Sequence, residues 1–195
     1  VQDDVPITAQ ILNRYKNFNE RVSKNLKIKT VEFTSTKAVK PYVKPVFDLI
    51  NKTYTEIYGF TKLTEDEMTE FAERFLSLLN PKLIKMITDE NGELLAFVIA
   101  MADLSEAIKN SRGRILPFGW ARIFWAMKTS KRLQLLLGAI HPNYQNKGLD
   151  AVLATMLFGS AIKLGFKTVD SHLIMKDNLK MRGEIEKLDG FNLYK

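Results

Sequence analysis

The stretch at residues 135–153 constrains the fold more than any other part of the sequence. An apolar run reaches Ile140, a short polar segment containing Gly148 follows, and the next residues have the apolar spacing of an amphipathic helix. A buried strand that turns tightly into a helix leaves the first backbone N–H groups of that helix without helical partners. Such amides can hold a phosphate group. The stretch predicts a phosphate site, although an ordinary strand-to-helix turn would have the same pattern.

Composition limits the classes of protein and site to consider. With 195 residues, 46% of them hydrophobic, the chain can form one folded domain with its own core. It has no cysteine, which excludes disulfides, thiolate catalysis and cysteine metal ligands. The two histidines, His141 and His172, are far apart in the sequence, so we expect no metal site.

Charge and hydropathy indicate the compartment and the partners. Lysine and arginine number 29 against 22 acidic residues, a net charge of +7. Because the basic residues are dispersed, we expect a solvated surface with one phosphate site and no nucleic-acid partner. No apolar run is long enough to span a bilayer, and the first residues include Asp3 and Asp4, unlike the basic start of a signal peptide. These features favour a cytoplasmic protein.

The pattern along the chain predicts alternating strands and helices. Helical spacing of apolar residues occurs at 7–24, 40–58, 64–79, 149–163 and 177–188. Thr64 and Glu67 form a capping-box pattern at the start of one of these helices. Strands are expected at 27–34, 83–88, 94–101, 135–140, 167–175 and 192–195, and Asn91-Gly92 predicts a hairpin between the second and third. This order favours an α/β fold, a mixed sheet with helices on both faces.

Residues 115–128 are the least regular part of this pattern. They contain both tryptophans, Trp120 and Trp125, among basic residues. A helix packed on the core, a lid over a ligand groove and a helix lying on a membrane surface are all compatible with the segment.

Residues 140–148, Ile-His-Pro-Asn-Tyr-Gln-Asn-Lys-Gly, resemble the hallmark of the GCN5-related N-acetyltransferases (GNATs). In that family an apolar strand precedes Pro-x-Tyr and then Gln/Arg-x-x-Gly-x-Gly/Ala. Asn178 after the strand at 168–175, and the helix end at 186–191, agree with the family pattern. Residues 57–60 and 116–120 are similar to an uncharacterised bacterial subgroup. The resemblance implies an acyl-CoA N-acyltransferase fold, a mixed twisted sheet with helices on both faces, at 27–195. Residues 1–26 would be a helical connector from a further N-terminal region.

The resemblance also implies a donor site for acetyl-CoA or another acyl-CoA, used as a co-substrate. The backbone of Gly138, Ala139 and Ile140 would pair with the pantetheine arm. The pyrophosphate would be held by the backbone amides of Gln145, Asn146, Lys147, Gly148, Leu149, Asp150 and Ala151. Asn178 would contact the pantetheine or the thioester. The acceptor, a small-molecule or peptide amine that attacks directly, would pass the segment at 54–60 and Asp103.

Two positions depart from the family pattern. Asp150 replaces a small residue beside the expected diphosphate, and Ile185 stands where many members have a tyrosine that protonates the leaving thiolate. Acyl transfer to an amine still needs a group that takes the proton of the amine. Glu56 and Asp103 are the candidate bases, and Tyr58 is a candidate acid.

Two other functions are compatible with the same residues. Ile185 and Asp150 would suit an acyl-CoA-binding module without catalysis. The Trp120 and Trp125 segment would suit an acyltransferase that contacts a membrane or a long acyl chain.

Overall fold

The computed structural model describes residues 5–7, 9–55, 57, 59–105, 125 and 128–170. Several predictions lie outside these residues: the catalytic candidates Glu56 and Tyr58, the donor contact Asn178, Trp120, and the helix and strand expected after residue 176. These stay predictions.

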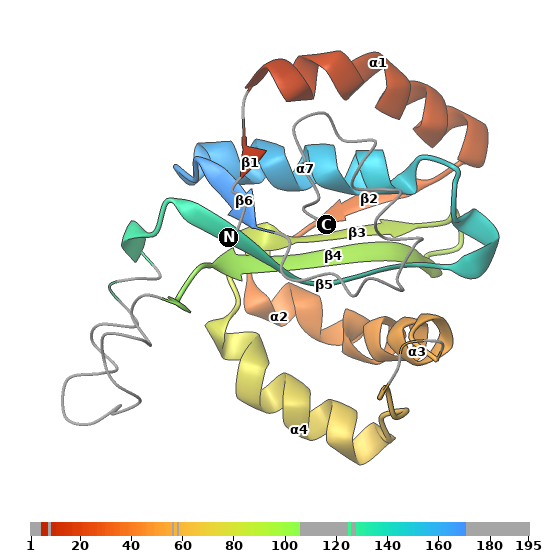
Figure 1. Ribbon diagram of the computed structural model, residues 1–195. Coiled ribbons are helices and arrows are strands. Elements are labelled where there is room, and N and C mark those ends of the chain that lie inside the picture. Colours follow the sequence, from red (N-terminus) through yellow and green to blue (C-terminus); the bar gives the residue numbers. More distant parts are fainter. Residues whose placement is uncertain are drawn as a thin grey trace.

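The six described strands form one mixed sheet (Figure 1). Neighbouring strands are antiparallel except for one parallel pair, β5 with β6. Their order across the sheet is β1 (Val5–Pro6), β6 (Thr168–Asp170), β5 (Arg132–Ile140), β4 (Leu94–Ala102), β3 (Ile84–Thr88) and β2 (Lys29–Glu32). The predicted hairpin is confirmed as β3 and β4, and Gly92 in its turn has φ +89°.

Helices cover both faces of the sheet, as predicted (Figure 1). Helices α1 (Ala9–Leu26) and α7 (Leu149–Lys163) lie on one face. Helices α2 (Thr36–Val39), α3 (Val43–Thr53) and α4 (Glu65–Phe75) lie on the other. Short 3-10 turns are formed by Lys40–Tyr42, Leu76–Leu78, Pro81–Leu83 and Pro142–Tyr144.

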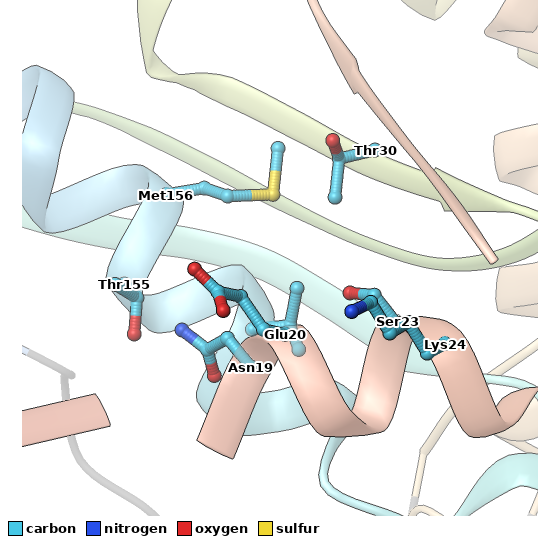
Figure 2. A pocket seen from close by; sticks show the side chains of 8 residues that line it. Asn19, Glu20, Ser23, Lys24, Thr30, Thr155 and Met156 are labelled. Atoms are coloured by element: carbon cyan, nitrogen blue, oxygen red, sulfur yellow. The ribbon is translucent and has the colours of Figure 1, made fainter. Parts of the chain in front are cut away.

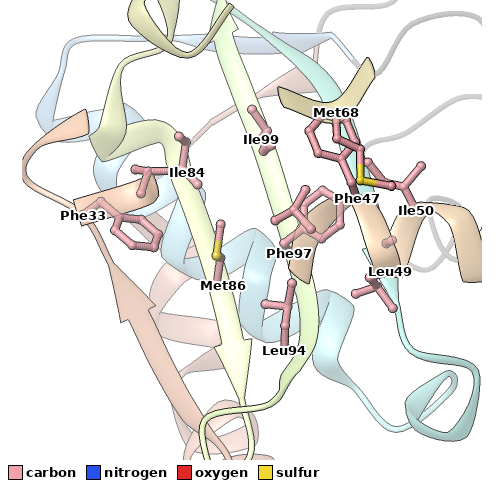
Figure 3. Close-up of a cluster of buried hydrophobic side chains, with 13 residues drawn as sticks. Phe33, Phe47, Leu49, Ile50, Met68, Ile84, Met86, Leu94, Phe97 and Ile99 are labelled. Atoms are coloured by element: carbon pink, nitrogen blue, oxygen red, sulfur yellow. The ribbon is translucent and has the colours of Figure 1, made fainter. Parts of the chain in front are cut away.

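Successive side chains of β4 point to opposite faces of the sheet and contribute to separate core clusters. Phe97 and Ile99 point toward α3 and α4, where they pack with residues such as Phe47 and Met68 (Figure 3). Their neighbours Ala96 and Ala100 belong to the clusters on the α1 and α7 side. Since successive side chains of a strand face opposite sides, the small alanines let α7 lie close to the sheet.

The helix expected at 40–58 has different bounds in the structure. It is divided, because Pro41 lies in a 3-10 turn and α3 ends at Thr53. At its C-terminal end Tyr54 turns toward β5, and the ring of Tyr54 contacts that of Phe60 at 5.7 Å between centroids. The capping box is confirmed: the Thr64 hydroxyl accepts from the backbone N–H of Glu67, whose carboxylate accepts from the N–H of Thr64.

Helix α1 packs along α7. A Cβ placed on Gly148 would lie 2.8 Å from Cζ of Phe18 and 3.1 Å from Cγ2 of Val22. Leu12 lies beside Gly159 further along α7. The domain boundary expected at residue 26 stays a prediction, but α1 contributes buried side chains such as Val22 to the same core as α7.

Candidate functional site

A β-bulge interrupts the middle of β5. Ile99 of β4 pairs with Leu137, whereas the next residue, Ala100, pairs with Leu135. Leu136 is therefore the extra residue, and it is partly exposed. A bulged residue is left out of the ladder, so the backbone groups of Leu136 do not pair with β4.

Beyond the bulge, backbone groups of β5 alternate between the two sides of the strand. The N–H of His141 donates to the carbonyl of Leu95 at 2.7 Å, which marks a hydrogen-bonded position facing β4. Because such positions alternate in antiparallel pairs, Ala139 also faces β4, whereas Gly138 and Ile140 face away. Of the three predicted backbone contacts, Gly138 and Ile140 thus have the orientation that an added strand requires.

Side chains engage both outward-facing residues. The Tyr54 hydroxyl donates to the Gly138 carbonyl at 2.8 Å and accepts from the Gly138 N–H at 3.4 Å. The amide of Gln145 donates to the Ile140 carbonyl at 3.3 Å. Among the described residues, β6 pairs with β5 only at 132–134, well before this edge.

The turn between β5 and α7 follows directly after this edge. Pro142–Tyr144 forms a 3-10 turn, and Asn146 and Gly148 have positive φ values of +59° and +87°. Gly148 is the N-cap of α7, which begins at Leu149. The first amides of a helix lack helical acceptors, and with the positive end of the helix dipole they favour an anion. The predicted strand, turn and helix are therefore present, in the order a phosphate cradle needs.

Positive side chains flank this turn. Nζ of Lys147 lies 5.1 Å from the centroid of the Tyr144 ring, and Nζ of Lys52 lies 2.6 Å from Nε2 of His141. Partial burial, and then the positive charge of Lys52, hold the pKa of His141 below its ordinary value of 6.5. Asp150, the departure from the family pattern, lies in the first turn of α7, where a carboxylate is favoured by the helix dipole.

Asp103 is buried near the opposite end of β5. Its carboxylate pairs with Nη1 of Arg132 at 3.3 Å and accepts from the N–H of Ser105 at 2.8 Å. Arg132 also pairs with Asp170 at 3.4 Å. From Arg132 to Gly138 is six residues of strand, about 20 Å. The structure therefore does not bring Asp103 together with Gly138.

Tyr54 and Lys52 are the site residues that the sequence pattern did not single out. Each meets a residue of β5 or its turn more than 80 positions away. The signal available in the sequence was their position at the end of the helix expected at 40–58. It could not identify their partners, because these depend on how α3 lies across the sheet.

A hollow away from this strand edge lies between α1, α7 and β2 (Figure 2). Its volume is about 460 Å³, and its lining includes Asn19 of α1, Thr30 of β2 and Met156 of α7. Oδ1 of Asn19 is buried and has no hydrogen-bond partner in the described part of the chain.

No cluster of acidic or histidine side chains suited to a metal ion occurs in the described ranges. None of the described helices is long and apolar enough to cross a bilayer.

Two curated proteins show similarity to this sequence. The bacterial ceramide synthase of Caulobacter vibrioides is 23% identical over 154 residues, which are 76% of this chain and 40% of that protein. Protein YghO of Escherichia coli K12 is 27% identical over 112 residues, 56% of this chain and 28% of that protein. The chain thus spans less than half the length of either relative. No protein-family model matches the chain.

Solved structures show the fold. A proposed acetyltransferase from Acinetobacter baylyi ADP1 has a TM-score of 0.55 at 15% identity, covering 83% of this chain and 77% of that one. An N-acetyltransferase from Staphylococcus aureus Mu50 has a TM-score of 0.53 at 13% identity, covering 83% and 82%. The C-terminal domain of a proposed lysylphosphatidylglycerol synthetase from Agrobacterium fabrum has a TM-score of 0.52 at 10% identity, covering 87% and 45%. The expected α/β architecture is confirmed, and the chain has the fold of the GCN5-related N-acetyltransferases.

Proposed function

We propose that this chain is an acyl-CoA-dependent N-acyltransferase domain. The observation that carries the proposal is the continuity between the outward-facing backbone of Gly138 and Ile140 and the amide-rich turn that starts α7. An extended amide chain ending in a diphosphate, such as the pantetheine arm of CoA, matches both parts at once. In this arrangement the predicted contacts at 145–151 hold the diphosphate and Asn178 contacts the pantetheine or thioester.

The bulge at Leu136 fits the chemistry of acyl transfer. An amine nitrogen attacks the thioester carbon, the C–S bond breaks, and the thiol leaves as the amine loses a proton. The carbonyl oxygen gains negative charge as the new bond forms, and a backbone N–H outside the sheet ladder can stabilise it. Gly138 lies two residues, about 7 Å, from Leu136, a span suited to the short arm between the last pantetheine amide and the thioester carbonyl. Glu56, Asp103 and Tyr58 remain the proposed proton-transfer residues.

A lipid-like amine is the acceptor class we favour over a peptide. A ceramide contains a fatty amide of a long-chain base, so the relative from Caulobacter vibrioides is named for a product with an N-acyl bond. In this chain Phe71, Phe75 and Leu78 expose 40–48% of their surface on one side of α4 and the turn after it, and Trp125 exposes 68%. Exposed large apolar side chains of this kind can contact an acyl chain or a lipid surface.

Calorimetric titration and thiol release test the proposal together. The protein is titrated with acetyl-CoA and with palmitoyl-CoA, and thiol release is then followed with a long-chain amino alcohol, a short primary amine and a lysine-containing peptide. We expect donor binding, with thiol release fastest for the long-chain amine. Binding without thiol release for any amine would favour the non-catalytic module, and absence of binding to both donors would refute the proposal.

Membrane contact is tested separately by co-sedimentation with liposomes. We expect wild-type protein to sediment with the lipid and Trp125→Ala to sediment less, with Phe166→Leu, a substitution at a buried site, as the control. Sedimentation that is absent, or equal for both variants and the wild type, would remove membrane contact through Trp125.

A further inference from the structure

Tyr54 occupies the edge of β5 at the centre of the proposed donor site. It is the C-cap residue of α3, and its hydroxyl reaches residue 138 from a helix on the α3 and α4 face of the sheet. The same oxygen donates to the Gly138 carbonyl and accepts from the Gly138 N–H, at 2.8 and 3.4 Å. One side-chain group therefore satisfies both backbone groups of this residue.

These two hydrogen bonds are those that a neighbouring strand would make. Gly138 faces away from β4, so its N–H and carbonyl need partners from outside the β4–β5 ladder. A hydroxyl supplies one donor and one acceptor, as an amide of an extended chain does. Both cannot occupy the same position, so a ligand that pairs with Gly138 has to displace Tyr54.

We propose that Tyr54 is a placeholder for the pantetheine amide of the acyl donor, and that donor binding displaces its hydroxyl from Gly138. This inference rests on the proposed function, because it assumes that an acyl-CoA lies along β5. In the protein without donor, Tyr54 keeps the strand edge paired, and it competes with the pantetheine arm. Burial raises the pKa of Tyr54 above its ordinary value of 10.0, so the hydroxyl keeps the proton that it donates.

Displacement of Tyr54 also changes the surface where the acceptor is expected. The Tyr54 ring meets the Phe60 ring edge-on at 5.7 Å. The connecting segment includes Gly59, which has φ +79° and, among the described residues, no atom within 4 Å of the position that a Cβ would occupy. Movement of the Tyr54 ring would therefore change this aromatic contact, which lies in the segment that the acceptor is expected to pass.

Replacing Tyr54 with phenylalanine tests the placeholder directly. The variant keeps the ring and removes the hydroxyl, so the donor no longer competes with it. Calorimetric titration uses CoA, which carries the pantetheine arm, and adenosine 3′,5′-bisphosphate, which does not. We expect Y54F to bind CoA about three- to tenfold more tightly than wild type, the range for one net hydrogen bond. Its affinity for the bisphosphate should equal that of wild type.

Tyr42→Phe is the matched control. Tyr42 packs edge-on against Phe33 on the same face of the sheet, with centroids 5.3 Å apart. Unlike Tyr54, its hydroxyl makes no hydrogen bond to β5 within the described part of the chain. We expect this variant to bind both ligands as wild type does. Unchanged or weaker CoA binding by Y54F, or equal tightening for both ligands, would overturn the placeholder. If wild-type protein binds neither CoA nor the bisphosphate, the proposed donor site itself is refuted.

Discussion

Replacing Gly148 with alanine should destabilise the fold through two separable effects. The residue has φ +87°, a backbone conformation that costs a non-glycine residue about 1–2 kcal/mol. The new Cβ would also lie 2.8 Å from Cζ of Phe18 and 3.1 Å from Cγ2 of Val22. Phe18 is half-exposed and can move outward, so we expect this contact to add about 1–2 kcal/mol, near the low end for overpacked sites.

The chain offers a control that separates these effects. Gly92 has φ +89°, but no atom of the described part of the chain lies within 4 Å of the position that a Cβ would occupy. Gly92→Ala should therefore lose only the backbone part, about 1–2 kcal/mol, whereas Gly148→Ala should lose about 2–4 kcal/mol. Urea unfolding followed by circular dichroism measures both differences.

Coupling to helix α1 gives the decisive comparison. If Phe18 causes the excess, adding Phe18→Ala to Gly148→Ala should make the double variant more stable than the sum of the two single losses predicts. Equal losses for Gly148→Ala and Gly92→Ala, or strictly additive losses in the double variant, would show that α1 does not press on the turn. The packing argument for Gly148 would then be wrong.

Three further predictions concern single side chains. Thr64→Ala removes the hydroxyl that accepts a hydrogen bond from the backbone N–H of Glu67. Urea titrations should show a free energy of unfolding about 1 kcal/mol lower than that of wild type. An unchanged free energy would show that the capping box does not stabilise α4. Because the pKa of His141 lies below 6.5 in the fold, the unfolded chain binds the proton first as the pH falls, so wild-type stability should decrease below pH 6.5. His141→Gln should flatten this dependence in unfolding curves at several pH values, and an unchanged slope would contradict the assignment. Lys147→Gln should weaken CoA binding about fivefold and reduce the salt dependence of that binding. Lys163→Gln, at the other end of α7, should change neither quantity. If calorimetry gives the two variants the same CoA affinity and salt dependence, a local role for Lys147 is refuted.

The sequence predicted those features whose causes lie within a few residues. Thr64 and Glu67 are three positions apart, and Asn91-Gly92 forms the turn that joins two adjacent strands. The turn at Gly148 belongs to the same group, since a helix start needs only its neighbouring amides and a residue that accepts positive φ. Local geometry of this kind depends on residues that are close together in the sequence, so a short segment is enough to predict it.

The features that escaped prediction depend on contacts between distant segments. The helix expected to reach residue 58 ends at Thr53, where Tyr54 turns to a strand 84 positions later. The apolar spacing at 7–24 predicts a helix, but nothing in it indicates that Phe18 lies against Gly148. Asp103 directly follows β4, yet its ion pair with Arg132 depends on the pairing of β4 with β5. Side-chain partners are fixed only once helices and strands are in place.

At Gly138 both local backbone geometry and contacts with distant segments bear on why the residue is glycine. Its φ is not positive, so the backbone does not require glycine at this position. A Cβ there would approach only the carbonyl oxygen of Phe97, at 3.4 Å, and Cγ2 of Val98, at 3.8 Å, among the described residues. Neither turn geometry nor a severe clash within this part of the chain therefore explains the missing side chain. A glycine does, however, leave the strand edge open to close approach by another chain or ligand. The two hydrogen bonds that Tyr54 makes with Gly138 therefore lie where a glycine leaves most room for an approaching ligand.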